Sequence, residues 1–171
     1  IADITIKLYW IHFLQISYKH ALLFPALASF GLLAGAFWFE IIVGLPPCNL
    51  CILQRWPHVI VIAIAFIGHV AIKQNWMLLL IALSAISTSL IGLYHVAVEQ
   101  RWLSGPSGCS NQLNSDSDIS SVTNSLLEMP VVKCDEITWS LMGISMAGWN
   151  SILSVSIAIF AFLCWKKLTQ K

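Results

Sequence analysis

Charged residues are scarce in this sequence, and their scarcity excludes whole classes of function. They make up 10% of the 171 residues, whereas hydrophobic residues make up 58%. No run of lysine and arginine is long enough to follow a phosphate backbone, so we expect no nucleic-acid partner. Internal repeats, a glycine-rich phosphate loop and a nucleophile elbow are also absent. Such a composition is typical of an integral membrane protein.

Four long apolar segments each approach the roughly 20 residues that a helix needs to cross a bilayer. They lie at about residues 22–43, 52–72, 76–98 and 147–165, which predicts an all-α bundle of four transmembrane helices. Residues 1–20 are apolar but interrupted by charged and polar side chains, so we expect an interfacial helix there, an uncleaved anchor rather than a signal peptide. A single transmembrane domain is expected over residues 21–171.

The lysines predict how these helices are oriented. Four spans put both termini on one side, and most lysines fall on that side, whereas the other side receives Arg55, Arg101 and Lys133. By the positive-inside rule, both termini are cytoplasmic. The loop between the third and fourth spans, about residues 100–146, therefore faces outward. Its length and polar composition predict a mobile, functional segment, and the apolar residues from 122 to 129 predict a short amphipathic helix on the membrane surface.

A Cys-x-x-Cys pair, Cys48 and Cys51, stands where the first span ends and the second begins. Two thiols at this spacing can close a small disulfide ring, and if the second, Cys51, heads a helix, the helix dipole favours its thiolate. Arg55 follows Cys51 by four residues and so lies one turn further along the same helical face. A cation so close to the membrane core predicts an anionic or electron-rich partner.

The five cysteines divide into four on the outer side and one on the inner side. The outer four are Cys48, Cys51, Cys109 and Cys134, whereas Cys164, at the inner end of the last span, is expected to be a buried apolar residue. Static disulfide staples are one alternative for the outer four. A zinc site is another, but it would need a second closely spaced ligand pair, so we expect no metal. A c-type haem is excluded because Ile52 stands where Cys-x-x-Cys-His needs histidine.

Ionisable side chains form a second cluster at the depth of the outer leaflet. Ionisable groups within a span are costly and indicate a site by default, although each could instead reach the headgroups or pair with a neighbour, as Glu40 could with Arg55. If the outer cysteines form disulfides by oxidation, each new disulfide releases two electrons and two protons, which need an acceptor near this cluster. A quinone is such an acceptor, and it resides in the bilayer. Arg55 could stabilise the negative charge that grows on a quinone oxygen. The cluster contains Glu40, Arg55, His58, His95 and Glu99.

Several motifs together resemble the DsbB family, the disulfide bond formation membrane proteins of bacteria. The resemblance covers nearly the whole chain after about residue 20. Its specific part is the order of four spans, a Cys-x-x-Cys followed by arginine, and a cysteine pair in the downstream loop. The motifs are Pro-Cys-Asn-Leu-Cys-Ile-Leu-Gln-Arg at 47–55, Gly-Leu-Tyr-His at 92–95, Gly-Pro-Ser-Gly-Cys at 105–109, Cys-Asp-Glu at 134–136 and Met-Ala-Gly-Trp-Asn at 146–150.

The resemblance implies a thiol:quinone oxidoreductase of the bacterial inner membrane with its redox loops in the periplasm. Such a protein oxidises a thioredoxin-fold dithiol protein of the DsbA type and passes the electrons to ubiquinone or menaquinone. The resemblance also implies a Cys109–Cys134 disulfide in which Cys109 meets the partner and Cys134 exchanges with Cys48. Cys51 would then face the quinone beside Arg55, and His95 matches a family position near the quinone. His58 is a further candidate for the quinone site because it lies in the same layer of the membrane.

Two rival interpretations remain open at this point. Membrane proteins similar to vitamin K epoxide reductase also combine loop cysteines, a Cys-x-x-Cys and a quinone, but there the loop pair precedes the redox motif, whereas here it follows. A non-enzymatic four-span scaffold or channel with disulfide-stapled outer loops is the other alternative. No continuous polar stripe runs along the spans, which disfavours a channel.

Overall fold

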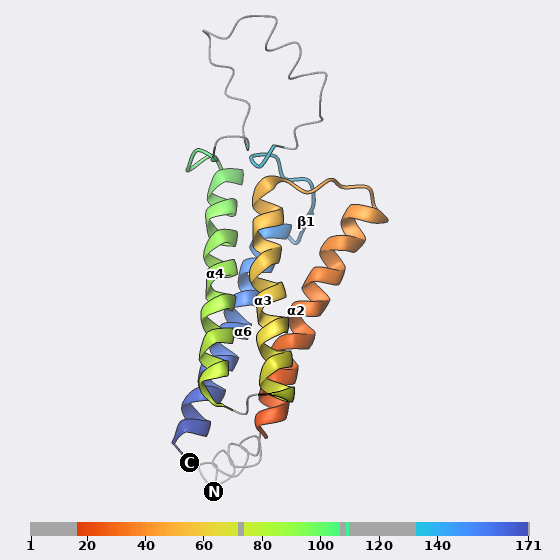
Figure 1. Ribbon diagram of the computed structural model, residues 1–171. Helices are drawn as coiled ribbons and strands as arrows, with labels where there is room; N and C mark the ends of the chain where they lie inside the picture. The colour runs from red at the N-terminus through yellow and green to blue at the C-terminus, as the bar shows by residue number, and fades with distance from the viewer. Residues whose placement is uncertain (1–16, 72–73, 107–108, 110–132, 171) are drawn as a thin grey trace, which may run out of the picture.

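Four long helices run side by side in a computed structural model that describes residues 17–71, 74–106, 109 and 133–170 (Figure 1). They are α2 (Tyr18–Ile41), α3 (Asn49–Val70), α4 (Trp76–Glu99) and α6 (Met146–Thr169). Each is long and apolar enough to cross a membrane. The prediction of an all-α, four-span membrane protein is confirmed.

The helix ends differ from the predicted spans by only a few residues. The first helix begins at Tyr18, so the last three residues of the segment predicted to be interfacial belong to α2. Residues 1–16 lie outside the described residues, and so does the amphipathic helix that we expect near residues 122–129. The first two helices end at Ile41 and Val70, two residues before the predicted limits.

The bundle exposes its large apolar side chains and buries its small residues. Leu27, Phe30 and Phe66 are 60%, 62% and 68% exposed, which is the arrangement expected of a surface covered by lipid. Small residues at the interfaces let membrane helices approach closely, because lipid supplies no hydrophobic drive to bring them together. Such buried positions include Ala21, Ser29, Ala65, Ala82, Ala85, Ala158 and Ala161.

Helices α4 and α6 are joined by hydroxyl groups and packed through glycine. The Ser89 and Ser151 hydroxyl oxygens lie 3.1 Å apart, and the Ser151 hydroxyl also donates to the Ser89 carbonyl. At Gly92 an added Cβ would come within 3.1 Å of the Ala147 carbonyl oxygen. The two backbones therefore need the absence of a side chain at Gly92 to approach this closely.

A short hairpin closes one end of the bundle and leads into the last helix. Strand β1 (Ser140–Leu141) pairs antiparallel with β2 (Ile144–Ser145). The intervening Gly143 has a φ of +78°, a conformation that glycine adopts readily. The Trp139 and Phe39 rings lie 5.0 Å apart, which attaches the hairpin to α2. The Cys-x-x-Cys lies at this same end, opposite the end where α2 begins and α6 terminates (Figure 1).

Candidate functional site

The Cys-x-x-Cys forms the N-terminus of α3. Cys48 is the N-cap residue, and its sulfur accepts a hydrogen bond from the Cys51 backbone N–H at 3.2 Å. The chain before it, Pro46-Pro47, cannot continue a helix backwards, which explains why α3 begins here. The two sulfurs, both free thiols, lie 2.7 Å apart. The helix therefore begins at this pair, and its N-cap is the first cysteine, Cys48, rather than Cys51.

The Cys48 thiol is placed where its anion is stabilised. Its pKa is lowered to about 4, chiefly because the Cys51 thiol donates a hydrogen bond to its sulfur, and burial opposes this effect. The nearby His95 ring and the Cys51 N–H favour the thiolate further. Because the thiolate is the form that attacks disulfides, Cys48 is poised for exchange chemistry.

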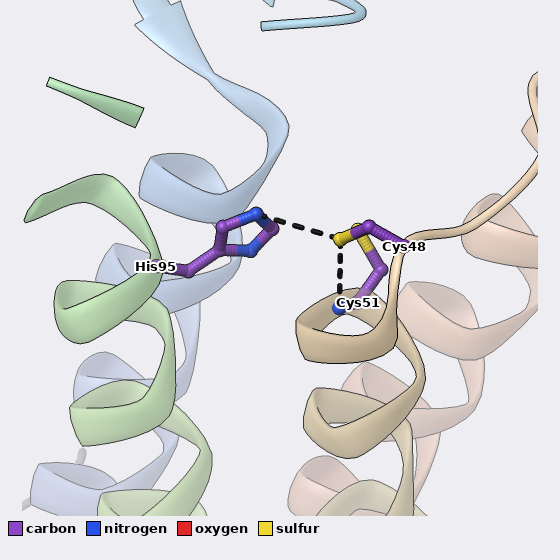
Figure 2. Close-up of side chains that lie close together, drawn as sticks. All are labelled: Cys48, Cys51 and His95. Carbon is purple, nitrogen blue, oxygen red and sulfur yellow. Dashed lines mark hydrogen bonds between the residues drawn. The ribbon is translucent and has the colours of Figure 1, made fainter. Parts of the chain in front are cut away.

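His95 reaches this pair from α4 and is fixed on both sides of its ring (Figure 2). Its Nε2 lies 3.5 Å from the Cys48 sulfur, and its Nδ1 lies 3.2 Å from Gln54 Oε1. Glu99 Oε1, one turn further along α4, lies 3.8 Å from the same Nε2. The ring is 3% exposed, so its orientation is set by the protein rather than by solvent.

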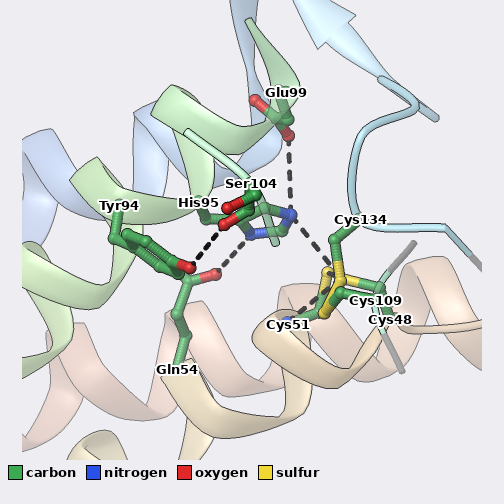
Figure 3. Close-up of a disulfide and its surroundings, with 9 residues drawn as sticks. All are labelled: Cys48, Cys51, Gln54, Tyr94, His95, Glu99, Ser104, Cys109 and Cys134. Atoms are coloured by element: carbon green, nitrogen blue, oxygen red, sulfur yellow. Dashed lines mark hydrogen bonds and ion pairs between the residues drawn. A yellow bond between two sulfur atoms is a disulfide. The ribbon is translucent and has the colours of Figure 1, made fainter. Parts of the chain in front are cut away.

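The other two outer cysteines are joined in a disulfide, Cys109–Cys134, beside the first pair (Figure 3). Both are buried, at 0% and 1% exposure. They share one apolar cluster with Cys48, and Cys51 packs against the same cluster. The backbone N–H of Cys134 donates to the Cys109 carbonyl at 2.8 Å, which holds the two loop segments together. The fold thus brings all four outer cysteines to one place.

Arg55 is paired with Glu40, the carboxylate that was expected as an alternative to a bound ligand. Its Nη1 forms an ion pair with Glu40 Oε2 from α2, and its guanidinium lies 4.8 Å from the centre of the Phe37 ring. Arg55 Nε is buried and has no partner among the described residues. The ion pair therefore holds the guanidinium in place and leaves its buried Nε–H available to a ligand.

His58 lies deeper in the bundle and contacts neither cysteine pair in the described structure. Its Nε2 lies 3.0 Å from Asn150 Oδ1 of α6, and its Nδ1 lies 3.3 Å from the Ser29 hydroxyl of α2. These contacts join three helices through one buried ring. Its position beside the cavity described next leaves a binding role open.

A cavity of about 400 Å³ connects these groups. Its wall is mostly apolar and includes Leu32, Phe39 and Leu153, whereas polar atoms come from a few inward side chains. Sites for small organic molecules have this composition, because apolar walls supply affinity and a few polar groups set orientation. The lining includes Cys48, Cys51, Gln54, Arg55, His58, His95 and Glu99.

A family model described as "Disulfide bond formation protein DsbB" matches residues 18–164. The chain belongs to the DsbB family. This DsbB chain is accordingly a multi-pass membrane protein whose family membership implies disulfide bond formation, the work of a disulfide-forming oxidoreductase.

Individual DsbB relatives agree with this assignment over most of their length. Disulfide bond formation protein B 2 of Pseudomonas aeruginosa is 31% identical over 148 residues, which are 82% of this chain and 84% of the relative. Disulfide bond formation protein B of Xylella fastidiosa is 30% identical over 168 residues, 92% of this chain and 95% of the relative. The protein of the same name from a Polaromonas species is 27% identical over 163 residues, 90% of this chain and 94% of the relative.

The DsbB site contains two polar residues that the sequence interpretation did not single out. Gln54 lines the cavity and holds the His95 ring, and Asn150 holds His58. Both are uncharged polar residues inside or at the edge of an apolar span, and that was the signal available for finding them. Neither periodicity nor spacing shows which histidine each one meets.

Proposed function

We propose that this DsbB chain oxidises a thioredoxin-fold dithiol protein of the DsbA type and transfers the electrons to a membrane quinone, ubiquinone or menaquinone. The observation that carries the proposal is the gathering of two cysteine pairs in one buried cluster beside an apolar cavity. A disulfide placed only to hold loops together needs neither a second thiol pair nor a cavity next to it.

The four cysteines can pass one disulfide along the chain. A thiolate of the partner attacks Cys109, the Cys109–Cys134 bond breaks, and the partner's second thiol releases Cys109 while forming the partner's disulfide. Cys134 then attacks Cys48 of an oxidised Cys48–Cys51 pair, and Cys51 leaves as the thiolate. Attack of Cys109 on Cys134 restores the loop disulfide and leaves Cys48 and Cys51 reduced. Each exchange conserves the number of S–S bonds, so the partner loses two electrons and Cys48–Cys51 gains them.

The cavity fits a molecule with an apolar body and carbonyl acceptors. Gln54 Nε2 and Arg55 Nε are buried donors without partners among the described residues, and both side chains line the cavity. An unpartnered buried donor costs free energy, which a carbonyl acceptor would relieve. A bound quinone would supply the acceptor for the two electrons and two protons released when Cys48 and Cys51 close their disulfide. Arg55, held by Glu40, would stabilise negative charge on an oxygen there.

Charge placement supports an orientation with the redox end in the periplasm of a bacterial inner membrane. Lys19 lies at the start of α2, and Lys166 and Lys167 lie at the end of α6, all at the end opposite the cysteines. Cytoplasmic ends of membrane helices are enriched in such lysines. The two helix ends at the lysine-rich side are accordingly assigned to the cytoplasm.

The test follows quinone absorbance with time in purified protein given a soluble quinone and a reduced thioredoxin-fold dithiol protein. We expect turnover in the parent, none in Cys48→Ser or Cys109→Ser, and weaker turnover in Arg55→Ala. Cys164→Ser is the matched control, because its thiol lies at the other end of the bundle. If the quinone stays oxidised with the parent and the cysteine variants only unfold at lower temperature, the pairs are structural staples and the proposal fails.

A further inference from the structure

The reduced Cys-x-x-Cys and His95 together present three metal-ligating atoms from two helices. The sulfurs of Cys48 and Cys51 and one ring nitrogen of His95 are ligand atoms that all lie within 4.8 Å of one another (Figure 2). Zinc holds sulfur at about 2.3 Å and nitrogen at about 2.0 Å, so its tetrahedral ligands stand roughly 3.5 to 3.8 Å apart. The separation of 3.5 Å between the Cys48 sulfur and His95 Nε2 is already of this size. The two sulfurs, at 2.7 Å, need to move apart by about 1 Å, which a rotation of the Cys51 side chain provides.

The contact on the far side of the His95 ring is the kind that metal-ligating histidines make. Gln54 Oε1 lies 3.2 Å from Nδ1, so Nδ1–H can donate to it. Such a hydrogen bond fixes the tautomer and leaves the Nε2 lone pair facing the metal position. The ring nitrogen that faces the Cys48 sulfur is Nε2.

Glu99 places a carboxylate next to His95, although it is not one of the three residues whose ligand atoms all lie within 4.8 Å of one another. Its side chain is 6% exposed, and Oε1 lies 3.8 Å from His95 Nε2. Its other oxygen, Oε2, is buried and has no hydrogen-bond partner among the described residues, although the Ser145 hydroxyl bonds to the carboxylate. A buried carboxylate oxygen left without a donor, one turn from a ligating histidine, is independent evidence that this corner of the cavity suits a cation.

We propose that the reduced Cys48–Cys51 dithiol, together with His95 and Glu99, binds a thiophilic divalent cation of the zinc class, and that the bound ion blocks disulfide exchange. Two thiolates, an imidazole and a carboxylate select zinc or cadmium over magnesium and calcium, which prefer oxygen ligands alone. Binding releases the Cys51 thiol proton, because Cys48 is already a thiolate at neutral pH. Closing the disulfide removes both anionic sulfur ligands, so the site exists only in the reduced state.

The proposed ligands lie in two groups that are far apart in sequence, at residues 48–51 and 95–99. Zinc was disfavoured above because no second closely spaced ligand pair accompanies the Cys-x-x-Cys. The proposal takes its second pair from His95 and Glu99, at i and i+4 on α4, and only the packing of α4 against α3 brings His95 to the thiols.

The binding experiment uses the full chain with Cys109→Ser and Cys134→Ser, so that loop thiols do not contribute. The protein in detergent is reduced without oxygen, freed of reductant and titrated with Cd²⁺, whose thiolate complexes absorb in the ultraviolet; competition with a chromophoric chelator gives the zinc affinity. We expect one Cd²⁺ per chain in the reduced state and none after the Cys48–Cys51 disulfide has been formed. Adding Cys164→Ser should change nothing, because that thiol is remote.

The variants separate ligation from folding. His95→Ala and Glu99→Gln should each weaken cadmium binding by at least about tenfold, and Gln54→Leu, which removes the support of the ring, by roughly 10- to 100-fold. His95→Cys should restore tight binding, which a purely structural role for the ring would not predict. Three results would each refute the metal site. They are equal binding to reduced and oxidised protein, loss of binding in Cys164→Ser, and unchanged binding in both His95→Ala and Glu99→Gln.

The inhibitory part rests on the proposed function and is measured separately. Reduced parent protein is loaded with one equivalent of Zn²⁺, freed of unbound metal and assayed for quinone reduction. We expect a lag or loss of turnover that a chelator reverses. Full turnover by zinc-loaded protein refutes the inhibition. Cadmium binding by a parent that never reduces quinone would refute the proposed function and leave the metal site standing.

Discussion

Gly92 is the position where one added methyl group should disturb both the packing and the site. A Cβ there would stand 2.8 Å from Gln54 Nε2, 3.0 Å from Ser151 Cβ and 3.1 Å from the Ala147 carbonyl oxygen. The carbonyl cannot move without shifting α6, and the Gln54 amide is held by His95. Overfilling a packed interior typically costs about 1–3 kcal/mol.

Gly31→Ala is the matched control for Gly92→Ala. Both glycines lie inside membrane helices, but nothing lies within 4 Å of a Cβ added at Gly31. Both variants gain up to about 1 kcal/mol of helix propensity, so the difference between them isolates the steric term of about 1–3 kcal/mol. For a chain of this length each kcal/mol corresponds to about 2–4 °C in Tm.

Thermal unfolding followed by tryptophan fluorescence in detergent measures this difference. We expect the Tm of Gly92→Ala to lie roughly 2–12 °C below that of Gly31→Ala. Quinone turnover should fall in Gly92→Ala alone, because displacing the Gln54 amide turns the His95 ring. Equal Tm values for the two variants would refute the close packing of α4 on α6 from which the prediction is derived.

Three further predictions concern single contacts. Asn150→Ala removes a hydrogen-bond partner of the buried His58 ring, which costs about 1–3 kcal/mol of folding free energy. Its Tm should therefore lie several degrees below that of the control Ser156→Ala, which removes an exposed hydroxyl that bonds only within its own helix. Glu40→Gln should raise the KM for quinone by less than about fivefold, because a partly exposed ion pair contributes at most about 1 kcal/mol. If Glu40→Gln raised this KM more than Arg55→Ala does, the supporting role given to Glu40 would be wrong. Cys164→Ser should leave both the Tm and quinone turnover within error of the parent, and a loss of turnover would place this thiol in the electron path.

The sequence by itself determined the membrane architecture. Apolar runs long enough to cross a bilayer have one favourable structure there, because a lipid-exposed backbone must satisfy its hydrogen bonds within the segment. The start of α3 was equally readable, since Pro46-Pro47 precedes a cysteine that caps the helix with its own side chain. The spacing of Arg55 from Cys51 likewise needed only helical geometry. Each of these features depends on residues that are neighbours in sequence.

Only the tertiary structure decided how groups on different helices meet. Arg55 and Glu40 form an ion pair that depends on how α2 crosses α3, and this pairing leaves the buried Arg55 Nε available to a ligand. The contact of His95 with the thiols depends on the rotation of α4, and Gly92 allows α4 to approach α6 closely. Gln54 and Asn150 each hold a histidine from a different helix, at sequence separations of 41 and 92 residues. No local pattern encodes such contacts, because they arise from the packing of small residues across the whole bundle.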